Sequence, residues 1–175
     1  MICGLEPVSI QELRVLGGPK QWTVEGHLDQ LPSLTSVRGQ ISAEHKGNVL
    51  AVEGELETIV TLCCDRCLTQ YNHALKARPS ELIWLGDAPP SESERQESEQ
   101  IAAMDGLVEC LNPSGDFTPV EWVFEQLNLQ LPVINYCGEH CPGTPGLNGS
   151  TAATNDQHAE RLDPRWQALR RLQQA

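Results

Sequence analysis

Two pairs of cysteines in this chain have the spacing of metal ligands. Two residues separate Cys64 from Cys67, and three separate Cys137 from Cys141. Thiolates in a Cys-x-x-Cys turn can both reach one centre at about 2.3 Å, the Zn–S bond length of zinc knuckles. One pair supplies half of a tetrahedral site, so the fold would have to bring the second pair to it across residues 68–136. We therefore predict a candidate structural zinc site formed by these four cysteines.

Two other interpretations of the thiols stay open, a redox pair and unliganded side chains. A thioredoxin-like Cys-x-x-Cys opens a helix after a strand in a βαβ unit, and no such unit is visible, which disfavours redox catalysis. Unliganded thiols behave as small apolar residues, which is how we interpret Cys3 and Cys110. Cys63 alternates faces with the first knuckle cysteine and is interpreted as a packing residue. His140 directly precedes a cysteine of the second pair, so joint ligation by both would be awkward.

Motifs of known catalytic sites do not occur in the sequence. It contains no Gly-x-Ser-x-Gly, no phosphate-binding glycine-rich loop and no His-Glu-x-x-His. No acid–base pair stands out either. We therefore expect a protein that is not an enzyme.

The charge of the chain favours protein partners over nucleic acid. Its 24 acidic and 12 basic residues give a formal net charge of −12 over 175 residues. Such a field repels phosphate backbones and attracts a basic partner such as a ribosomal protein, although acidity also keeps ordinary proteins soluble. Seven cysteines, no signal peptide and no apolar run of about 20 residues predict a reducing, cytoplasmic location.

The elements that must position the cysteines begin with one long strand. Residues 49–62 alternate between apolar and polar side chains, so one face should be buried and the other wet. A Gly-Asn pair at 47–48 predicts a hairpin with the strand-like residues before it, and residues 71–85 can run back beside the long strand. The Cys64–Cys67 turn then lies on a sheet rim. Residues 22–28 and 108–111 also read as strands, whereas residues 8–16 fit helix or strand equally well.

A helix is predicted before the second cysteine pair. Thr118 suits the N-cap, Pro119 the first helical position and Glu121 the capping-box partner, and Pro132 closes the segment. Five apolar residues at helical spacing form a stripe that should pack on the sheet. They are Val120, Val123, Phe124, Leu127 and Leu131.

These elements predict an α+β fold: an antiparallel β-sheet or partly open barrel, with one main helix packed on it and a short C-terminal helix. We expect residues 1–141 to form a single domain, with residues 86–106 as an acidic loop inside it. Residues 142–160 should form a flexible loop. Residues 161–175 should form the C-terminal helix, with an apolar face and an arginine-rich face, and dock onto the domain or a partner.

Four blocks of sequence resemble the YceD-like family, the large ribosomal RNA subunit accumulation proteins of bacteria and chloroplasts. The first is the strand and knuckle Val60–Cys67, and the second runs from Gly115-Asp116-Phe117 through the predicted helix to Val133. The third is Glu139-His140-Cys141, and the fourth is the closing segment that begins Asp163-Pro164-Arg165-Trp166. The blocks fall in family order and cover most of the chain from about residue 49.

The resemblance implies a non-enzymatic factor needed for accumulation or processing of 23S ribosomal RNA in large-subunit biogenesis. By position, Cys64, Arg66 and Cys67 match the family knuckle, and Cys141 matches the downstream cysteine. Many members continue with further cysteine pairs where this chain has residues 142–146, so a metal here would depend on the second pair found above. We hypothesise that the chain escorts a basic large-subunit protein or assembly factor. The alternative is a zinc-stapled protein-interaction module unrelated to ribosomes.

Overall fold

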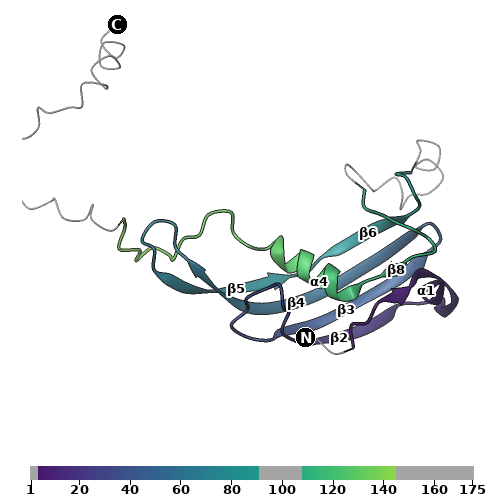
Figure 1. Ribbon diagram of the computed structural model, residues 1–175, viewed down its shortest axis with the longest axis horizontal. Coiled ribbons are helices and arrows are strands. Elements are labelled where there is room, and N and C mark those ends of the chain that lie inside the picture. Colours follow the sequence, from purple (N-terminus) through teal and green to yellow (C-terminus); the bar gives the residue numbers. More distant parts are fainter. Residues whose placement is uncertain (1–3, 91–107, 145–175) are drawn as a thin grey trace, which may run out of the picture.

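The computed structural model describes residues 4–90 and 108–144, and these residues form mostly β-structure with two helices (Figure 1). The helices are α1 (Ile10–Leu16) and α4 (Pro119–Asn128). The strands are β1 (Val8–Ser9), β2 (Lys20–Gly26), β3 (Val37–Lys46), β4 (Val49–Cys63), β5 (Gln70–Ala77), β6 (Ser80–Leu85), β7 (Cys110–Leu111) and β8 (Asp116–Phe117).

One open sheet of six strands is built around β4. The strand order is β2-β3-β4-β6-β7, and β5 also pairs with β4. β5 pairs with residues 56–63 of β4 and β6 with residues 49–53, so both lie on the same side of the long strand. All pairs are antiparallel except β6–β7, and β1 and β8 form a separate two-stranded pair. The sheet does not close, so the barrel alternative is wrong, whereas the antiparallel sheet is confirmed except for the β6–β7 pair.

The alternation in β4 has the predicted consequence. Leu50, Val52, Leu56 and Val60 are at most 2% exposed, and Thr58 on the same face is also buried, while the side chains between them on the opposite face are exposed or half-buried. The β3–β4 hairpin turns at Gly47, whose φ of 69° lies in the left-handed region that glycine adopts without steric cost. Residues 71–85 return beside β4 as expected, but as two strands with a break between them.

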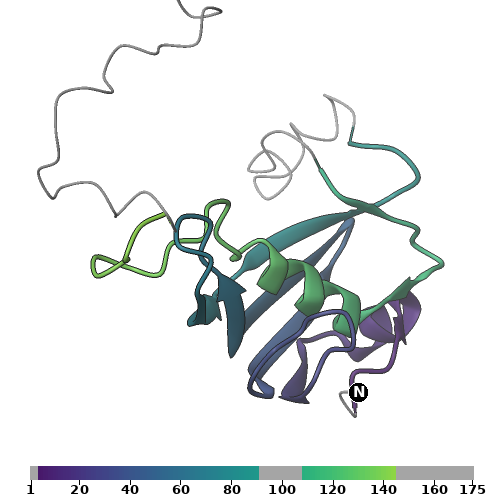
Figure 2. The same cartoon turned by 60° about the vertical axis from the view of Figure 1, so that its left-hand side comes forward.

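Helix α4 covers the buried face of the sheet (Figures 1 and 2). Its buried side chains include Trp122, Val123 and Leu127. Trp122 was not among the residues predicted for the apolar stripe. Its indole NH donates to Glu81 at 2.7 Å, so the side chain can lie in the core without an unsatisfied donor. The helix begins at the predicted residue but ends at Asn128, earlier than the apolar stripe suggested. Thr118 is the N-cap residue, yet its side chain makes no capping hydrogen bond, so the predicted capping box is wrong.

Residues 8–16, whose conformation the sequence left undecided, split into β1 and α1. The Ser9 side chain accepts a hydrogen bond from the Glu12 backbone at 3.1 Å, which caps the helix, and Gly17 ends it with a φ of 65°. Ile10 and Leu13 are buried, so this short helix is held by packing. The prediction of one main helix in the body was therefore incomplete.

Several expected features lie outside the described residues. These are most of the acidic loop at 86–106, the part of the predicted flexible loop beyond Thr144, and the C-terminal helix at 161–175. Within residues 4–90 and 108–144, no helix has the length and apolarity needed to cross a membrane.

The carboxyl of Glu109, which lies close to that of Glu81, leads to a prediction about how the stability of the fold depends on pH. Glu109 is exposed as a residue, but partial burial of its carboxyl and the neighbouring Glu81 and Glu125 raise its pKa. When the pKa of a carboxyl is higher in the folded than in the unfolded state, ionising that carboxyl costs more in the folded state. The free energy of unfolding therefore falls as the pH rises above the carboxyl's unfolded-state pKa. Glu109→Gln should therefore raise the thermal midpoint at pH 7, and the gain should shrink as the pH falls toward 4. Glu53→Gln, on the outer face, is the matched control, and an unchanged midpoint in Glu109→Gln would contradict the prediction.

Candidate metal centre

The first cysteine pair sits in a tightly closed turn between β4 and β5. The Cys64 backbone NH donates to the Thr69 carbonyl at 3.0 Å, and the Leu68 NH donates to the Cys64 carbonyl at 2.8 Å. Leu68 adopts a φ of 61°, the only positive value of a non-glycine residue among those described. This conformation costs free energy in a leucine, so the surrounding turn must hold it in place.

The second pair reaches this turn through the segment that follows α4. Figures 1 and 2 show that segment running from the helix to the β4–β5 turn. The Asp65 NH donates to the Asn135 carbonyl at 2.9 Å, and the Asn135 NH donates to the Asp65 carboxylate at 2.7 Å. These two reciprocal bonds dock the segment on the turn one residue before Tyr136 and two before Cys137. A turn in which the Cys141 NH donates to the Gly138 carbonyl at 3.1 Å then carries the last cysteine inward.

The four sulfurs converge with the spacing of a tetrahedral site. All four Sγ atoms lie within 4.8 Å of one another. The Cys64–Cys141 pair is 3.9 Å apart and the Cys67–Cys137 pair is 3.6 Å apart. Four thiolates at the Zn–S length of about 2.3 Å stand roughly 3.8 Å apart around a regular tetrahedron, whereas disulfide sulfurs are about 2.05 Å apart. The donor set and its spacing therefore fit a four-thiolate metal site.

The centre is shielded on its turn side. Cys64 is fully buried and Cys67 is 6% exposed, while Cys137 and Cys141 are half-buried. Four protein ligands fill a tetrahedral coordination sphere, which is typical of structural sites. Catalytic zinc sites instead keep one position for water or substrate. The arrangement suits a staple rather than a reaction centre.

Backbone hydrogen bonds lower the pKa of Cys64, which favours the thiolate form that a metal binds. Burial acts to raise the pKa of Cys64, but hydrogen bonds from the backbone of Cys67, Arg66 and Cys137 outweigh it and lower this pKa to about 6. Burial and the three neighbouring thiols raise the pKa of Cys137 to about 12. Without a metal, the negative charge therefore concentrates on the β4–β5 turn. A bound cation would remove the remaining thiol protons, because the thiolate is the ligand.

Other residues considered from the sequence lie outside the cluster. Cys63 is exposed, and its Sγ lies 3.4 Å from the Leu68 carbonyl, so the expected packing role is wrong. Cys110 is half-buried beside Val49 and Trp84, as a small apolar residue would be. His140 does not join the four sulfurs. Cys3 is outside the described residues.

An apolar rim next to the centre was not foreseen. Four large side chains lie within four residues of a cysteine in sequence and are 46–100% exposed. They are Leu68, Val133, Ile134 and Tyr136, and we call them the apolar rim. Single exposed apolar residues are ordinary, but here the bonds between Asp65 and Asn135 hold the two segments that carry them together, and exposed apolar groups of this kind are typical of interaction sites. The signal in the sequence was the run Val133-Ile134-Asn135-Tyr136 directly after Pro132.

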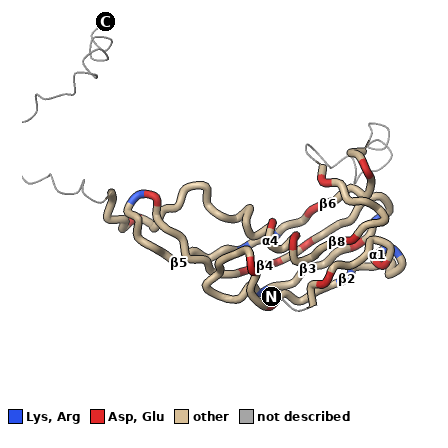
Figure 3. Tube along the Cα trace, viewed as in Figure 1, with Lys and Arg blue, Asp and Glu red and all other residues tan. Residues whose placement is uncertain are grey.

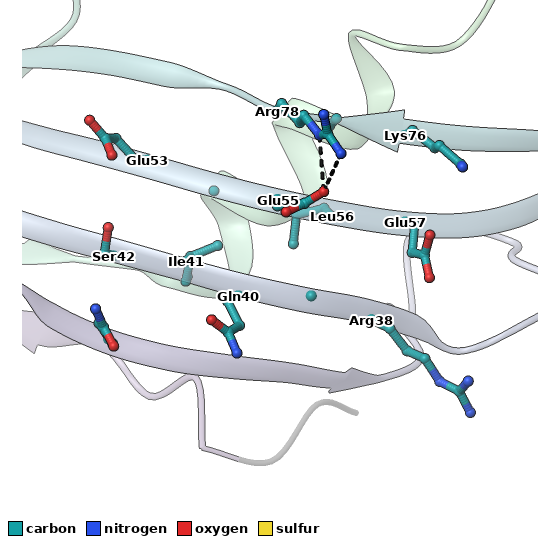
Figure 4. Close-up of a pocket in the computed structure, with 14 residues that line it drawn as sticks. Arg38, Gln40, Ile41, Ser42, Glu53, Glu55, Leu56, Glu57, Lys76 and Arg78 are labelled. Carbon is teal, nitrogen blue, oxygen red and sulfur yellow. Dashed lines mark hydrogen bonds and ion pairs between the residues drawn. The ribbon is translucent and has the colours of Figure 1, made fainter.

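A broad hollow lies away from the cysteines, on the outer face of the sheet (Figure 4). It has a volume of about 1010 Å³ and is lined by residues of β3, β4 and β5, together with Gln21 of β2 and Arg78 just after β5. Its charges balance, because three basic side chains stand beside three acidic ones, and Arg78 pairs with Glu55 at 2.6 Å. Figure 3 likewise shows acidic and basic residues mixed over the body without a basic stripe. Nothing in this face favours a phosphate backbone.

Fold and site together define a small α+β protein whose central strand ends in a four-thiol centre. The family described as "Large ribosomal RNA subunit accumulation protein YceD" matches residues 52–173. The match covers well over half of the chain, and the chain therefore belongs to this family. It includes both cysteine pairs and α4 but leaves out β1, β2 and β3. No curated protein and no solved structure matches the chain significantly.

Proposed function

We propose that this protein is a non-enzymatic factor that supports accumulation or processing of 23S ribosomal RNA during large-subunit biogenesis, through contacts with proteins. The observation that carries the proposal is the family match over residues 52–173, since the family has its role in ribosomal RNA accumulation. The same role and the seven cysteines of the chain support action in the cytoplasm. The main core runs from Leu5 to Leu127, which supports one domain over residues 1–141.

In this proposal Cys64, Cys67, Cys137 and Cys141 bind zinc. The support is the convergence of four sulfurs within 4.8 Å from two segments far apart in the chain. Bound zinc would act as a cross-link and do no chemistry on a substrate. The protein's own residues fix the geometry, because the β4–β5 turn presents one pair and the segment docked on Asp65 presents the other.

The staple would serve to present the apolar rim to a partner protein. Leu68 directly follows one ligand and Tyr136 directly precedes another, so fixing the cysteines also fixes these side chains. The net charge of −12 opposes direct binding to RNA and favours a basic partner. We therefore propose a basic ribosomal protein or assembly factor of the large subunit as that partner.

The test removes the protein from cells and measures the ribosomal RNA. We expect the ratio of 23S to 16S RNA to fall, and the protein in normal cells to sediment with large-subunit precursors. A pull-down at low and moderate salt should recover a basic protein, with more of it at low salt. An unchanged RNA ratio together with no association with subunits would favour the alternative, a zinc-stapled interaction module unrelated to ribosomes. Recovery of naked ribosomal RNA without a basic protein would contradict the escort role.

Asp65 offers a test of how the second pair is positioned. Asp65→Ala removes the carboxylate that accepts the Asn135 NH at 2.7 Å but leaves all four ligands in place. Loss of such supporting contacts typically lowers metal affinity by about 10–100-fold. We expect a loss in this range, measured by competition with a chromophoric chelator. Gln70→Ala, at an exposed residue just after the same turn, is the control. Equal zinc affinity in Asp65→Ala and the wild type would show that this bond does not position the second pair.

A further inference from the structure

A groove beside α4 combines an apolar floor with an acidic rim. It has a volume of about 550 Å³ and lies between the N-terminal residues, the segment after β2 and the first turns of α4. Four of its lining residues are apolar side chains, namely Leu5, Leu28, Val120 and Phe124. Its charged lining residues are Glu6, Asp29 and Glu121, which are all acidic and exposed. An occupant that suits this groove has one apolar face flanked by positive charge.

Residues 161–175 of the same chain have that composition. They contain four arginines and one aspartate, whereas the whole chain is strongly acidic. Asp163 and Pro164 have the types preferred at the N-cap and the first helical position. In a helix beginning there, Trp166 and Leu169 would share a face, and Arg170 would lie next to it. The segment carries a large apolar anchor and the opposite charge to the groove.

The chain is long enough to bring this segment to the groove. The described residues end at Thr144, so residues 145–160 connect them to the segment. Sixteen residues span at most roughly 55 Å when fully extended. The longest element, β4, has 15 residues, which correspond to about 50 Å at the rise of a β-strand. Because β4 ends at the cysteine turn and α4 packs against the same sheet, a connection of this length is sufficient to reach the groove beside α4.

We propose that residues 161–175 dock into this groove, with Trp166 on the floor formed by Val120 and Phe124 and the arginines beside the acidic rim. The contact is intramolecular and needs neither the metal nor a ribosomal partner. It would cover the apolar floor next to α4. It would also tie the end of the chain to the N-terminal part of the body, which lies outside the family match.

Photo-cross-linking in the full-length chain tests the docking. Gln30, an exposed residue of the groove wall, is replaced by p-benzoylphenylalanine, and the products are mapped by mass spectrometry. We expect a cross-link to residues 161–175 at monomer mass. The same probe at Gln40, on the outer face of the sheet (Figure 4), should not give it. If the Gln30 variant does not fold, the probe is placed at Pro7, another exposed wall residue.

Two pairs of variants complete the test. Trp166→Ala should lower the cross-link yield by about tenfold or more, because removing a buried aromatic anchor has an effect of this size. Gln167→Ala, its neighbour in sequence, should leave the yield unchanged. Glu121→Lys should lower the yield, whereas Glu53→Lys on the outer face should not. A cross-link at dimer mass would show that a second copy fills the groove. That result, or equal yields from Gln30 and Gln40, would overturn the proposal.

Discussion

Cys64→Ser should reduce the zinc content of the purified protein from about one ion per chain to nearly none. Cys64 is fully buried, and its sulfur lies 3.9 Å from that of Cys141 at the proposed centre. Structural zinc sites contribute about 10–16 kcal/mol of apparent binding free energy, and the thiolates are the source of it. A serine in this position leaves three thiolates and a poorer ligand. Elemental analysis of protein purified without a chelating tag measures the difference.

Cys63→Ser is the matched control for this experiment. The residue is adjacent in sequence, but it is exposed and does not belong to the four-sulfur cluster. It should retain full zinc content, while Cys141→Ser should lose zinc as Cys64→Ser does. One zinc per chain in Cys64→Ser, or equal loss in Cys63→Ser, would contradict the assignment of the ligands.

Loss of zinc should loosen only the end of the molecule that the staple holds. The backbone bonds of Cys64, Asp65 and Cys141 lie at this tip, whereas the core under α4 is formed by other residues. We therefore expect faster amide hydrogen exchange in residues 64–69 and 133–141 of Cys64→Ser, with little change in β3. Uniform acceleration across the sheet would mean that the centre supports the whole fold, contrary to a local staple.

Gly39→Ala should destabilise the whole fold by about 3 kcal/mol or more, because it combines backbone strain with a clash. Gly39 has a φ of 154°, and an added Cβ would overlap the backbone carbonyl oxygen of Glu55 on the neighbouring strand. β3 and β4 pair along residues 38–57, so neither strand can move aside without breaking its ladder. The free energy of unfolding in urea measures the effect.

Gly18→Ala is the control for this substitution. No atom lies within 4 Å of the position that its Cβ would take, and its φ is not in the left-handed region. Its stability should stay within about 0.5 kcal/mol of the wild type, as for most surface changes. Equal stability of Gly39→Ala and Gly18→Ala would show that β3 and β4 can shift apart at Gly39 and accommodate the added Cβ.

The sequence by itself determined the elements whose patterns are local. Alternating side chains in residues 49–62 predicted β4, and the Gly-Asn pair predicted the hairpin before it, because burial on one face of a strand repeats every two residues. The helix after Thr118 followed from its proline and its apolar spacing. The family resemblance also followed from sequence blocks, and the match over residues 52–173 confirms it.

Tertiary packing decided what these local patterns left open. Residues 8–16 form β1 and α1 because Ile10 and Leu13 pack into the hydrophobic core. The local sequence does not reveal this packing. Trp122 lies in the core because Glu81, on β6, accepts its indole NH. The strand pairing also excludes the barrel alternative. β5 and β6 pair one after the other with the same side of β4, and the sheet stays open.

The meeting of the two cysteine pairs also depended on the tertiary structure. Each pair was recognisable from its spacing, but spacing says nothing of a partner that lies 70 residues away in the chain. The meeting required the length of β4, the packing of α4 on the sheet and the bonds between Asp65 and Asn135. The sequence therefore determined the thiols and the turns that carry them. Only the fold brought their sulfurs within 4.8 Å, because the direction of a chain after a helix is set by what that helix packs against.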